Sequence, residues 1–122
     1  MGLKVLLTDD EEDILEVVQD RLEAYGFLVV TARNGLEALK KLSTEKFDGV
    51  FLDVKMPGMN GIEVLQQIRK EDPKIPVIIL TSSSSREAAI ESIAKGASAY
   101  ILKPFEWEEL KGSIERVFNI SL

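Results

Sequence analysis

The sequence of 122 residues contains no cysteine and no histidine. These two absences exclude disulfides, thiolate or imidazole metal sites, a cysteine nucleophile and a phosphohistidine carried by this chain. A catalytic triad built on histidine is excluded for the same reason. Any chemistry that the chain performs must therefore use carboxylates, hydroxyls, lysines, arginines or a tyrosine.

Long apolar runs and positive charge are also scarce. No segment approaches the roughly 18 consecutive apolar residues of a membrane span, and the N-terminus lacks the layout of a signal peptide. We therefore expect a cytoplasmic protein that does not bind membranes. Acidic residues number 21 against 15 basic ones, a formal net charge of −6, which disfavours direct binding of nucleic acid.

The hydrophobic pattern alternates between two periods, which predicts one α/β domain over residues 1–122. Short apolar runs typical of strands occupy residues 3–7, 27–30, 50–52, 77–80 and 100–102. Between and after them, apolar residues recur at helical spacing: Ile14, Val18, Leu22 and Tyr25; Leu36, Leu39 and Leu42; Ile62, Leu65 and Ile68; Ile90, Ile93 and Ala97; Leu110, Ile114 and Val117. This order predicts a doubly wound parallel sheet of five strands with five helices on its two faces.

Turn-forming residues mark the boundaries of these helices. Gly26 and Gly96 are expected near the ends of the first and fourth helices, and Asp72-Pro73 near the end of the third. The serine run 82–85 is expected to form a loop that leads into the fourth helix.

Polar residues follow four of the five predicted strands. Asp9 and Asp10 follow the first, Asp53 the third, Thr81 ends the fourth, and Lys103 follows the fifth. Because the carboxyl ends of parallel strands share one edge of the sheet, we expect these side chains to converge there. Carboxylates gathered in one pocket repel each other and need a cation, and ligands that are all oxygen favour Mg²⁺.

Such a set of groups is suited to phosphoryl transfer. Thr81 offers a hydroxyl donor, Lys103 a positive charge for a phosphoryl oxygen, and an aspartate can act as the nucleophile. Taken singly, the residues have ordinary explanations: Asp9 and Asp10 could cap a helix, and Asp53 could form a turn. Those separate explanations do not account for complementary groups at four strand ends.

Four motifs in this order resemble the receiver domain of two-component response regulators. They are Thr-Asp-Asp-Glu at 8–11, Leu-Asp-Val-Lys-Met-Pro-Gly-Met-Asn-Gly at 52–61, Leu-Thr-Ser at 80–82 and Tyr-Ile-Leu-Lys-Pro-Phe at 100–105. The resemblance covers essentially the whole chain. It implies a flavodoxin-like (βα)5 fold with strand order 2-1-3-4-5.

The resemblance also implies a role for each matching residue. Asp53 is expected to be the phosphoacceptor, with Thr81 and Lys103 bound to phosphoryl oxygens. The expected Mg²⁺ ligands are Asp10, Asp53 and the main-chain carbonyl of Lys55, with Asp9 acting through a metal-bound water. Tyr100 matches the position of an aromatic switch residue, and the Lys103–Pro104 bond is expected to be cis.

The function implied is that of a signalling phosphoacceptor rather than an enzyme acting on a separate substrate. A histidine kinase or phosphotransfer protein would donate its phosphoryl group to Asp53, with Mg²⁺ required. Thr81 and Tyr100 would then move, which would remodel the face formed by the fourth helix, fifth strand and fifth helix. That face would control an output partner, which the sequence does not identify.

Two features leave the biological context open. Ser98 and Ala99 stand where receivers that dimerise to drive winged-helix domains carry acidic residues, so a phosphorylation-dependent homodimer of that type is in doubt. The chain is expected to be either a stand-alone receiver or a domain of a longer regulator.

Two other functions stay open at this point. A flavodoxin-like electron carrier shares the fold, although its first loop must bind a phosphate and here residues 9–13 are all acidic. A phosphatase of the haloacid dehalogenase type uses a similar set of residues in a different order. In such an enzyme position 55 would be an acid, whereas here it is Lys55.

Overall fold

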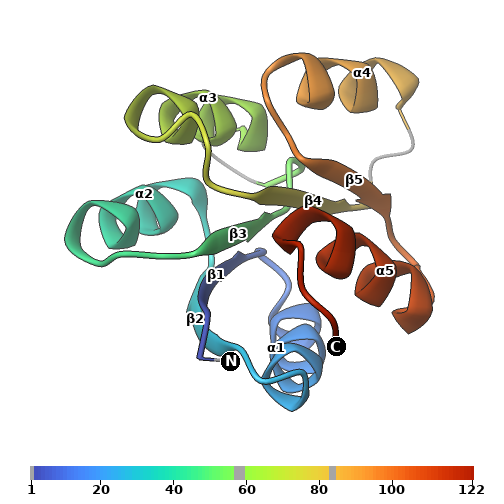
Figure 1. Cartoon of the computed structure of the whole chain (residues 1–122). Helices are drawn as coiled ribbons and strands as arrows, with labels where there is room; N and C mark the ends of the chain where they lie inside the picture. The colour runs from blue at the N-terminus through green and yellow to red at the C-terminus, as the bar shows by residue number, and fades with distance from the viewer. Residues whose placement is uncertain (1, 57–59, 83–84) are drawn as a thin grey trace.

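Five strands and five helices alternate along the chain (Figure 1). The computed structural model describes residues 2–56, 60–82 and 85–122. The strands are β1 (Lys4–Thr8), β2 (Leu28–Ala32), β3 (Gly49–Leu52), β4 (Val77–Thr81) and β5 (Ala99–Leu102). The helices are α1 (Glu12–Ala24), α2 (Gly35–Thr44), α3 (Gly61–Glu71), α4 (Arg86–Ala94) and α5 (Trp107–Phe118). Each predicted strand agrees with an observed one to within two residues, and the predicted order of elements is confirmed.

All neighbouring strands pair in parallel, in the order β2-β1-β3-β4-β5. The expected flavodoxin-like topology is therefore confirmed. Helices α2, α3 and α4 cover one face of the sheet, and α1 and α5 cover the other (Figure 1). Parallel strands place every carboxyl end at the same edge of the sheet.

Two hydrophobic clusters fill the layers on either side of the sheet. Leu6, Leu52 and Ile79 pack on the side of α2 and α3, whereas Phe51 and Ile78 pack on the side of α1 and α5. Because successive side chains of a strand point to opposite faces, each central strand supplies both clusters. These central side chains are fully buried, so the strand ends are held on a rigid base.

The predicted apolar face of the fourth helix is wrong. Ile90 and Ile93 are 59% and 51% exposed, and the buried residue of α4 is Ser92. Ala97, expected on the same face, follows the helix rather than lying in it. Leu36 is likewise 68% exposed at the start of α2. The apolar spacing therefore located both helices. It identified the packed side of α2, where Leu39 and Leu42 lie against the core, but not that of α4.

The predicted helix ends are confirmed. Gly26 and Gly96 adopt positive φ angles of 101° and 106° directly after the last turns of α1 and α4, a conformation that glycine adopts without a Cβ clash. Helix α3 ends at Glu71, before Asp72. Ser83 and Ser84 of the predicted serine loop, and residues 57–59 of the second motif, lie outside the described residues. In the part of the chain that is described, none of the helices has the length and apolarity required to span a membrane.

Candidate functional site

The parallel sheet brings the predicted site residues to one edge. Asp9 and Asp53 directly follow β1 and β3, Thr81 is the last residue of β4, and Lys103 directly follows β5. The backbone amide of Asp53 donates to the carbonyl of Thr8 at 3.0 Å, which holds the ends of β1 and β3 together. The predicted convergence of these residues is confirmed.

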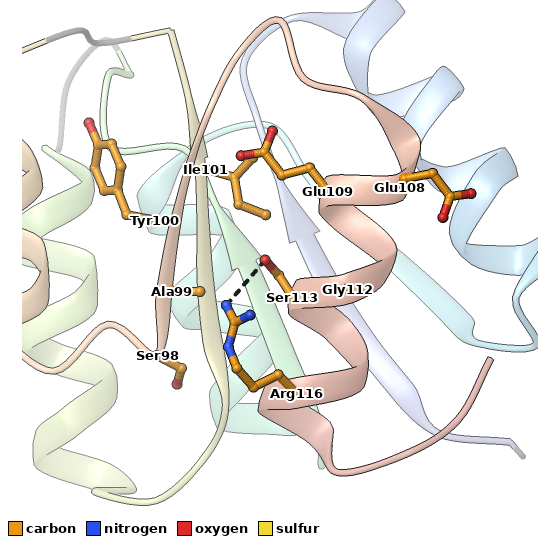
Figure 2. A pocket seen from close by; sticks show the side chains of 9 residues that line it. All are labelled: Ser98, Ala99, Tyr100, Ile101, Glu108, Glu109, Gly112, Ser113 and Arg116. Atoms are coloured by element: carbon orange, nitrogen blue, oxygen red, sulfur yellow. Dashed lines mark hydrogen bonds between the residues drawn. The ribbon is translucent and has the colours of Figure 1, made fainter.

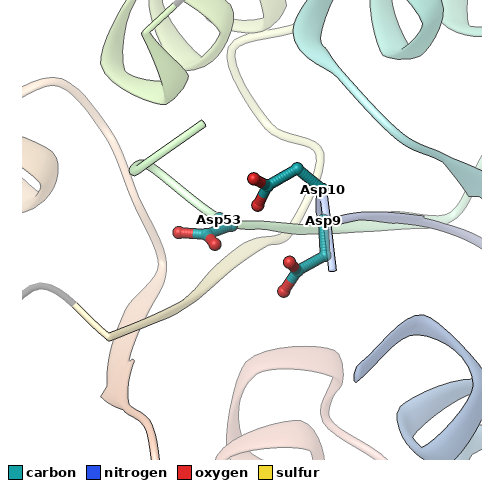
Figure 3. Close-up of side chains that lie close together, drawn as sticks. All are labelled: Asp9, Asp10 and Asp53. Atoms are coloured by element: carbon teal, nitrogen blue, oxygen red, sulfur yellow. The ribbon is translucent and has the colours of Figure 1, made fainter. Parts of the chain in front are cut away.

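Three aspartates form a compact acidic cluster at this edge (Figure 3). One carboxylate oxygen from each of Asp9, Asp10 and Asp53 lies within 4.8 Å of the other two. Asp9 and Asp53 are each 2% exposed, whereas Asp10 is exposed. The cluster is thus open to solvent on the side of Asp10 and buried on the side of the other two carboxylates.

Lys103 balances part of this negative charge. Its Nζ atom lies 2.6 Å from Asp9 Oδ2 and 3.5 Å from Asp53 Oδ2. The lysine side chain is only 8% exposed, so the attraction is weakly screened by solvent. One cation against three carboxylates leaves the cluster with a net negative charge. The Lys103–Pro104 peptide bond is cis, as the resemblance implied.

Backbone amides fix the orientation of the two buried carboxylates. The amide of Lys55 donates to Asp53 Oδ1 at 2.9 Å, and the amide of Glu11 donates to Asp9 Oδ1 at 3.0 Å. Both bonds span two residues and use the loop that follows the strand. They keep the side-chain oxygens pointed into the shared space rather than toward solvent.

Asp53 and Lys103 have shifted pKa values. Burial raises the pKa of Asp53, and although the bonds from Lys55 and Thr81 and the charge of Lys103 act in the opposite direction, the net shift is upward. For Lys103, burial alone lowers the pKa, but the hydrogen bond to Asp9 and the nearby carboxylate charges raise it overall. The lysine is therefore held in its charged form, and ionisation of Asp53 is disfavoured until more positive charge arrives.

A glycine allows the loop after β3 to pack against the start of α3. A Cβ atom on Gly61 would collide with the backbone carbonyl of Asp53 and with the Cα of Val54. The amide of Gly61 also donates to the Val54 carbonyl at 3.1 Å. Gly61 therefore sets the path of the chain directly after Asp53, a role that our reading of the sequence missed although the residue ends the second motif.

The donor set fits a hard divalent cation. Among the described residues, the acidic cluster supplies only carboxylate oxygens, with no soft ligand and a net negative charge. Mg²⁺ prefers such oxygens and keeps several water molecules, for which the exposed side of Asp10 leaves room. The backbone amide of Lys55 bonds to Asp53, so the Lys55 carbonyl belongs to the same loop as the cluster; its role as a ligand stays a prediction.

Tyr100 lies within β5, whereas the three aspartates of the acidic cluster follow β1 and β3. Its side chain packs on the side of α2 and α3 and points away from α5 (Figure 2). On the α5 side of the strand lies a cavity of about 450 Å³, lined by residues that include Ser98, Ala99, Glu109 and Arg116. The small residues at 98 and 99 contribute to this hollow.

One aromatic contact near the site has no counterpart in the sequence analysis. The Arg21 guanidinium of α1 lies 4.4 Å from the ring centre of Trp107 at the start of α5. Phe105 meets the same ring edge-on, with centroids 5.5 Å apart. This contact joins α1 to the loop that carries Lys103, and neither residue spacing nor residue type indicated that the two segments would meet.

Comparison with known families adds an independent observation. The sequence profile of the family described as "Response regulator receiver domain" matches residues 5–115. Two curated relatives are the alkaline phosphatase synthesis transcriptional regulatory protein PhoP of Bacillus subtilis, 38% identical over 121 residues, and the DNA-binding transcriptional regulator NtrC of Escherichia coli, 36% identical over 115 residues. The alignments cover 99% and 94% of this chain but only 50% and 24% of those proteins. The chain thus spans half the length of the first relative and about a quarter of the second.

Solved structures agree with this match. The response regulator TrrA of Thermotoga maritima, in complex with Mg²⁺ and BeF, is 38% identical with a TM-score of 0.86; the alignment covers 96% of this chain and 99% of that one. The chemotaxis protein CheY4 of Vibrio cholerae is 36% identical with a TM-score of 0.89, over the same shares of the two chains.

Proposed function

Since the chain belongs to the response regulator receiver domain family, we propose that it accepts a phosphoryl group on Asp53 and thereby switches the surface formed by α4, β5 and α5. The acceptor is assigned to Asp53 because its carboxylate is buried, lies beside Lys103 and shares the acidic cluster with Asp9 and Asp10. A flavodoxin-like carrier or a phosphatase of the haloacid dehalogenase type would belong to a different family, and no observation favours either function.

The acidic cluster would hold Mg²⁺ through Asp10, Asp53 and the Lys55 carbonyl, with Asp9 bonded to a water of the ion. When bound, Mg²⁺ supplies positive charge that lowers the repulsion between Asp53 and an incoming phosphoryl group. Asp9 has a second task in this arrangement, because it holds the Lys103 ammonium at 2.6 Å.

In the proposed transfer, one carboxylate oxygen of Asp53 forms a bond to phosphorus while the bond from phosphorus to the donor imidazole nitrogen breaks. The bonding electron pair stays on that nitrogen, which takes up a proton. Lys103 moves only a short distance to pair with a phosphoryl oxygen, since its Nζ is already 3.5 Å from Asp53. Thr81, which bonds to Asp53 in the resting protein, would turn its hydroxyl to another phosphoryl oxygen.

The proposed switch follows from the position of Thr81 between the site and α4. Movement of Thr81 toward the phosphoryl group vacates space at the end of β4, and Tyr100 on the neighbouring strand β5 rotates into it. The helix α4 would respond because it buries little apolar side-chain surface, with Ile90 and Ile93 more than half exposed. The change would reach a partner through α4, β5 and the cavity beside α5.

The proposed partners are a histidine kinase or phosphotransfer protein as donor and an output domain or protein as receiver of the signal. Two curated relatives are transcriptional regulators about two and four times as long as the matched segment. An output domain of that kind, rather than this domain, would carry any nucleic-acid contact. A homodimer formed on phosphorylation would have to use contacts other than acids at positions 98 and 99, which are Ser98 and Ala99.

Transfer to Asp53 can be tested with a small donor. We expect incubation with acetyl phosphate and Mg²⁺ to add one phosphoryl mass to the wild type, measured by intact-protein mass spectrometry. Asp53→Asn should abolish the addition, and Asp20→Asn, an exposed aspartate of α1, should leave it unchanged. Equal labelling of Asp53→Asn and the wild type would overturn the assignment of the acceptor.

A further inference from the structure

The arginine at position 69 joins three separate segments on the side of the sheet covered by α3 and α4. Its Nε atom donates to the carbonyl of Gly96 at 2.9 Å. Its Nη1 atom donates to the carbonyls of Asp72 at 3.1 Å and Ile75 at 2.7 Å. The guanidinium is half-buried and donates to three backbone carbonyls, so it ties the end of α3 and the segment before β4 to the turn between α4 and β5.

That turn is shaped to receive the arginine. Gly96 has φ of 106°, and a Cβ atom placed on it would lie 2.8 Å from Arg69 Nε. The turn is also fastened to β4, because the Ser98 amide donates to the Val77 carbonyl at 2.7 Å and the Ser98 hydroxyl accepts from the Val77 amide at 3.0 Å. The C-terminal end of α4 is therefore fixed to both α3 and the sheet.

The opposite end of α4 is held differently. The hydroxyl of Ser85 accepts from the Ala88 amide at 3.2 Å and meets the Glu87 carboxylate at 3.2 Å. These bonds stay within the first turn of the helix and do not join it to another element. Ser92, in the second half of α4, is its fully buried side chain, whereas Ala88 and Ala89 of the first half are only partly buried, so the N-terminal half is packed less deeply.

We propose that Arg69 is a positioning residue that makes the C-terminal end of α4 a fulcrum for the switch. The inference rests on the proposed function, because it concerns how α4 responds to the acceptor site. With the turn at Gly96 fixed, displacement that starts at Thr81 moves the N-terminal end of α4 and leaves Gly96–Ser98 in place. Without Arg69, the helix loses its pivot and shifts as a whole.

Amide hydrogen exchange, resolved residue by residue by NMR, tests this arrangement in the whole chain. In the resting protein, the amides of Ala97 and Ser98 should exchange more slowly than that of Ala89 in the first half of α4. Arg69→Met should accelerate exchange at Ala97 and Ser98 roughly tenfold, the factor that corresponds to about 1.4 kcal/mol and to the loss of a bond to a charged donor. Lys70→Met, which removes an exposed cation from the same helix, should leave both rates unchanged.

The switch itself is probed with the adduct of Mg²⁺ and beryllofluoride. In the wild type, adduct formation should change exchange in the first half of α4 and leave Ala97 and Ser98 unchanged. In Arg69→Met, the change should extend to those two amides. Arg69→Lys should behave like Arg69→Met, because lysine lacks the forked donor that reaches carbonyls of two segments.

The outcomes separate the two proposals. Changes at Ala97 and Ser98 equal to those in the first half of α4 in the wild type, or an unaltered pattern in Arg69→Met, would overturn the fulcrum. If Arg69→Met does not fold, Arg69→Lys takes its place, since it keeps the charge and the aliphatic stem but lacks the forked donor. Failure of acetyl phosphate to label Asp53 would instead overturn the phosphoacceptor, and the resting exchange rates would still decide whether Arg69 fixes the turn.

Discussion

The Nζ atom of Lys103 lies 2.6 Å from Oδ2 of Asp9, closer than its 3.5 Å separation from Oδ2 of Asp53. The lysine is thus bound more tightly to the carboxylate that is not the proposed acceptor. Because both members of the close pair are buried, removal of either one leaves an uncompensated charge. This relationship makes Lys103 important for folding as well as for the proposed phosphoryl transfer.

Lys103→Met should destabilise the metal-free protein by about 3 kcal/mol at neutral pH, because Asp9 would lose its buried partner. The raised pKa of Lys103 gives the sign of the pH dependence: its contribution is complete below the pKa of an unfolded lysine and is lost as pH rises through the folded value. Urea unfolding should therefore give the same difference in free energy of unfolding between the wild type and Lys103→Met at pH 7 and at pH 9. Mg²⁺ should raise the free energy of unfolding more in Lys103→Met than in the wild type. Lys40→Met, which removes an exposed lysine, is the control, and an equal loss of stability in the two variants would contradict the buried pairing of Lys103 with Asp9.

Asp53→Asn should raise the melting temperature of the metal-free protein at neutral pH by a few degrees, as expected for about 1 kcal/mol. Burial raises the pKa of Asp53 in the folded protein, so the fold favours the protonated acid. The stability that this acid contributes is lost as pH rises through the folded-state pKa. The ionised carboxylate is therefore destabilising at pH 7, and asparagine removes that charge.

The gain should shrink as the pH falls toward 3, where Asp53 is protonated in both the folded and unfolded chains. Thermal unfolding monitored by circular dichroism at pH 7 and pH 3, without Mg²⁺, measures both values. A lower melting temperature for Asp53→Asn at pH 7 would show that the acidic cluster is not strained by its own charge.

The sequence predicted the sheet and the acidic cluster because both depend on local pattern. Buried parallel strands require continuous apolar runs, and the site residues directly follow those runs, so the topology alone brings Asp9, Asp53 and Lys103 together. The exposed face of α4 was predicted wrongly because spacing cannot distinguish an apolar face that meets the sheet from one that meets solvent.

Contacts between distant residues were not predictable from pattern. Arg69 lies beside Ile68 in a helix that reads as ordinary amphipathic sequence, and its bond to Gly96 joins positions 27 residues apart. The packing of Arg21 on Trp107 likewise depends on how α1 and α5 are placed side by side. Such contacts follow from the tertiary arrangement, which the periodicity of apolar residues does not specify.

Mg²⁺ should raise the melting temperature of the wild type, because the acidic cluster, its proposed site, is assembled only in the folded state. At a free concentration one hundred times its dissociation constant the gain is about 2.7 kcal/mol. Asp10→Asn should reduce this gain strongly, since it removes the exposed carboxylate of the cluster. Asp13→Asn, an exposed aspartate of α1, should keep it, and equal gains in both variants would place the ion elsewhere.

Trp107 should report on the proposed switch through its fluorescence. The indole stacks with the Arg21 guanidinium and meets Phe105 two residues after Lys103, so movement of Lys103 toward a phosphoryl group should alter its surroundings. We expect beryllofluoride with Mg²⁺ to change the emission of the wild type but not of Asp53→Asn. An equal change in both proteins would mean that the additive acts on the indole without occupying the acceptor site.

Gly61→Ala should damage the site from its backbone side. The added Cβ would meet the Asp53 carbonyl and the Val54 Cα, and because both are backbone atoms the loop after β3 must shift. We expect the free energy of unfolding in urea to fall by roughly 1–3 kcal/mol, as for other overpacked positions, together with slower labelling of Asp53 by acetyl phosphate.

Gly112→Ala is the matched control, since nothing lies within 4 Å of a Cβ on that α5 residue. There alanine should stabilise the protein by about 0.5–1 kcal/mol through helix propensity and leave labelling unchanged. Equal labelling rates for the two variants would show that the close packing of α3 against the acceptor loop does not set the position of Asp53.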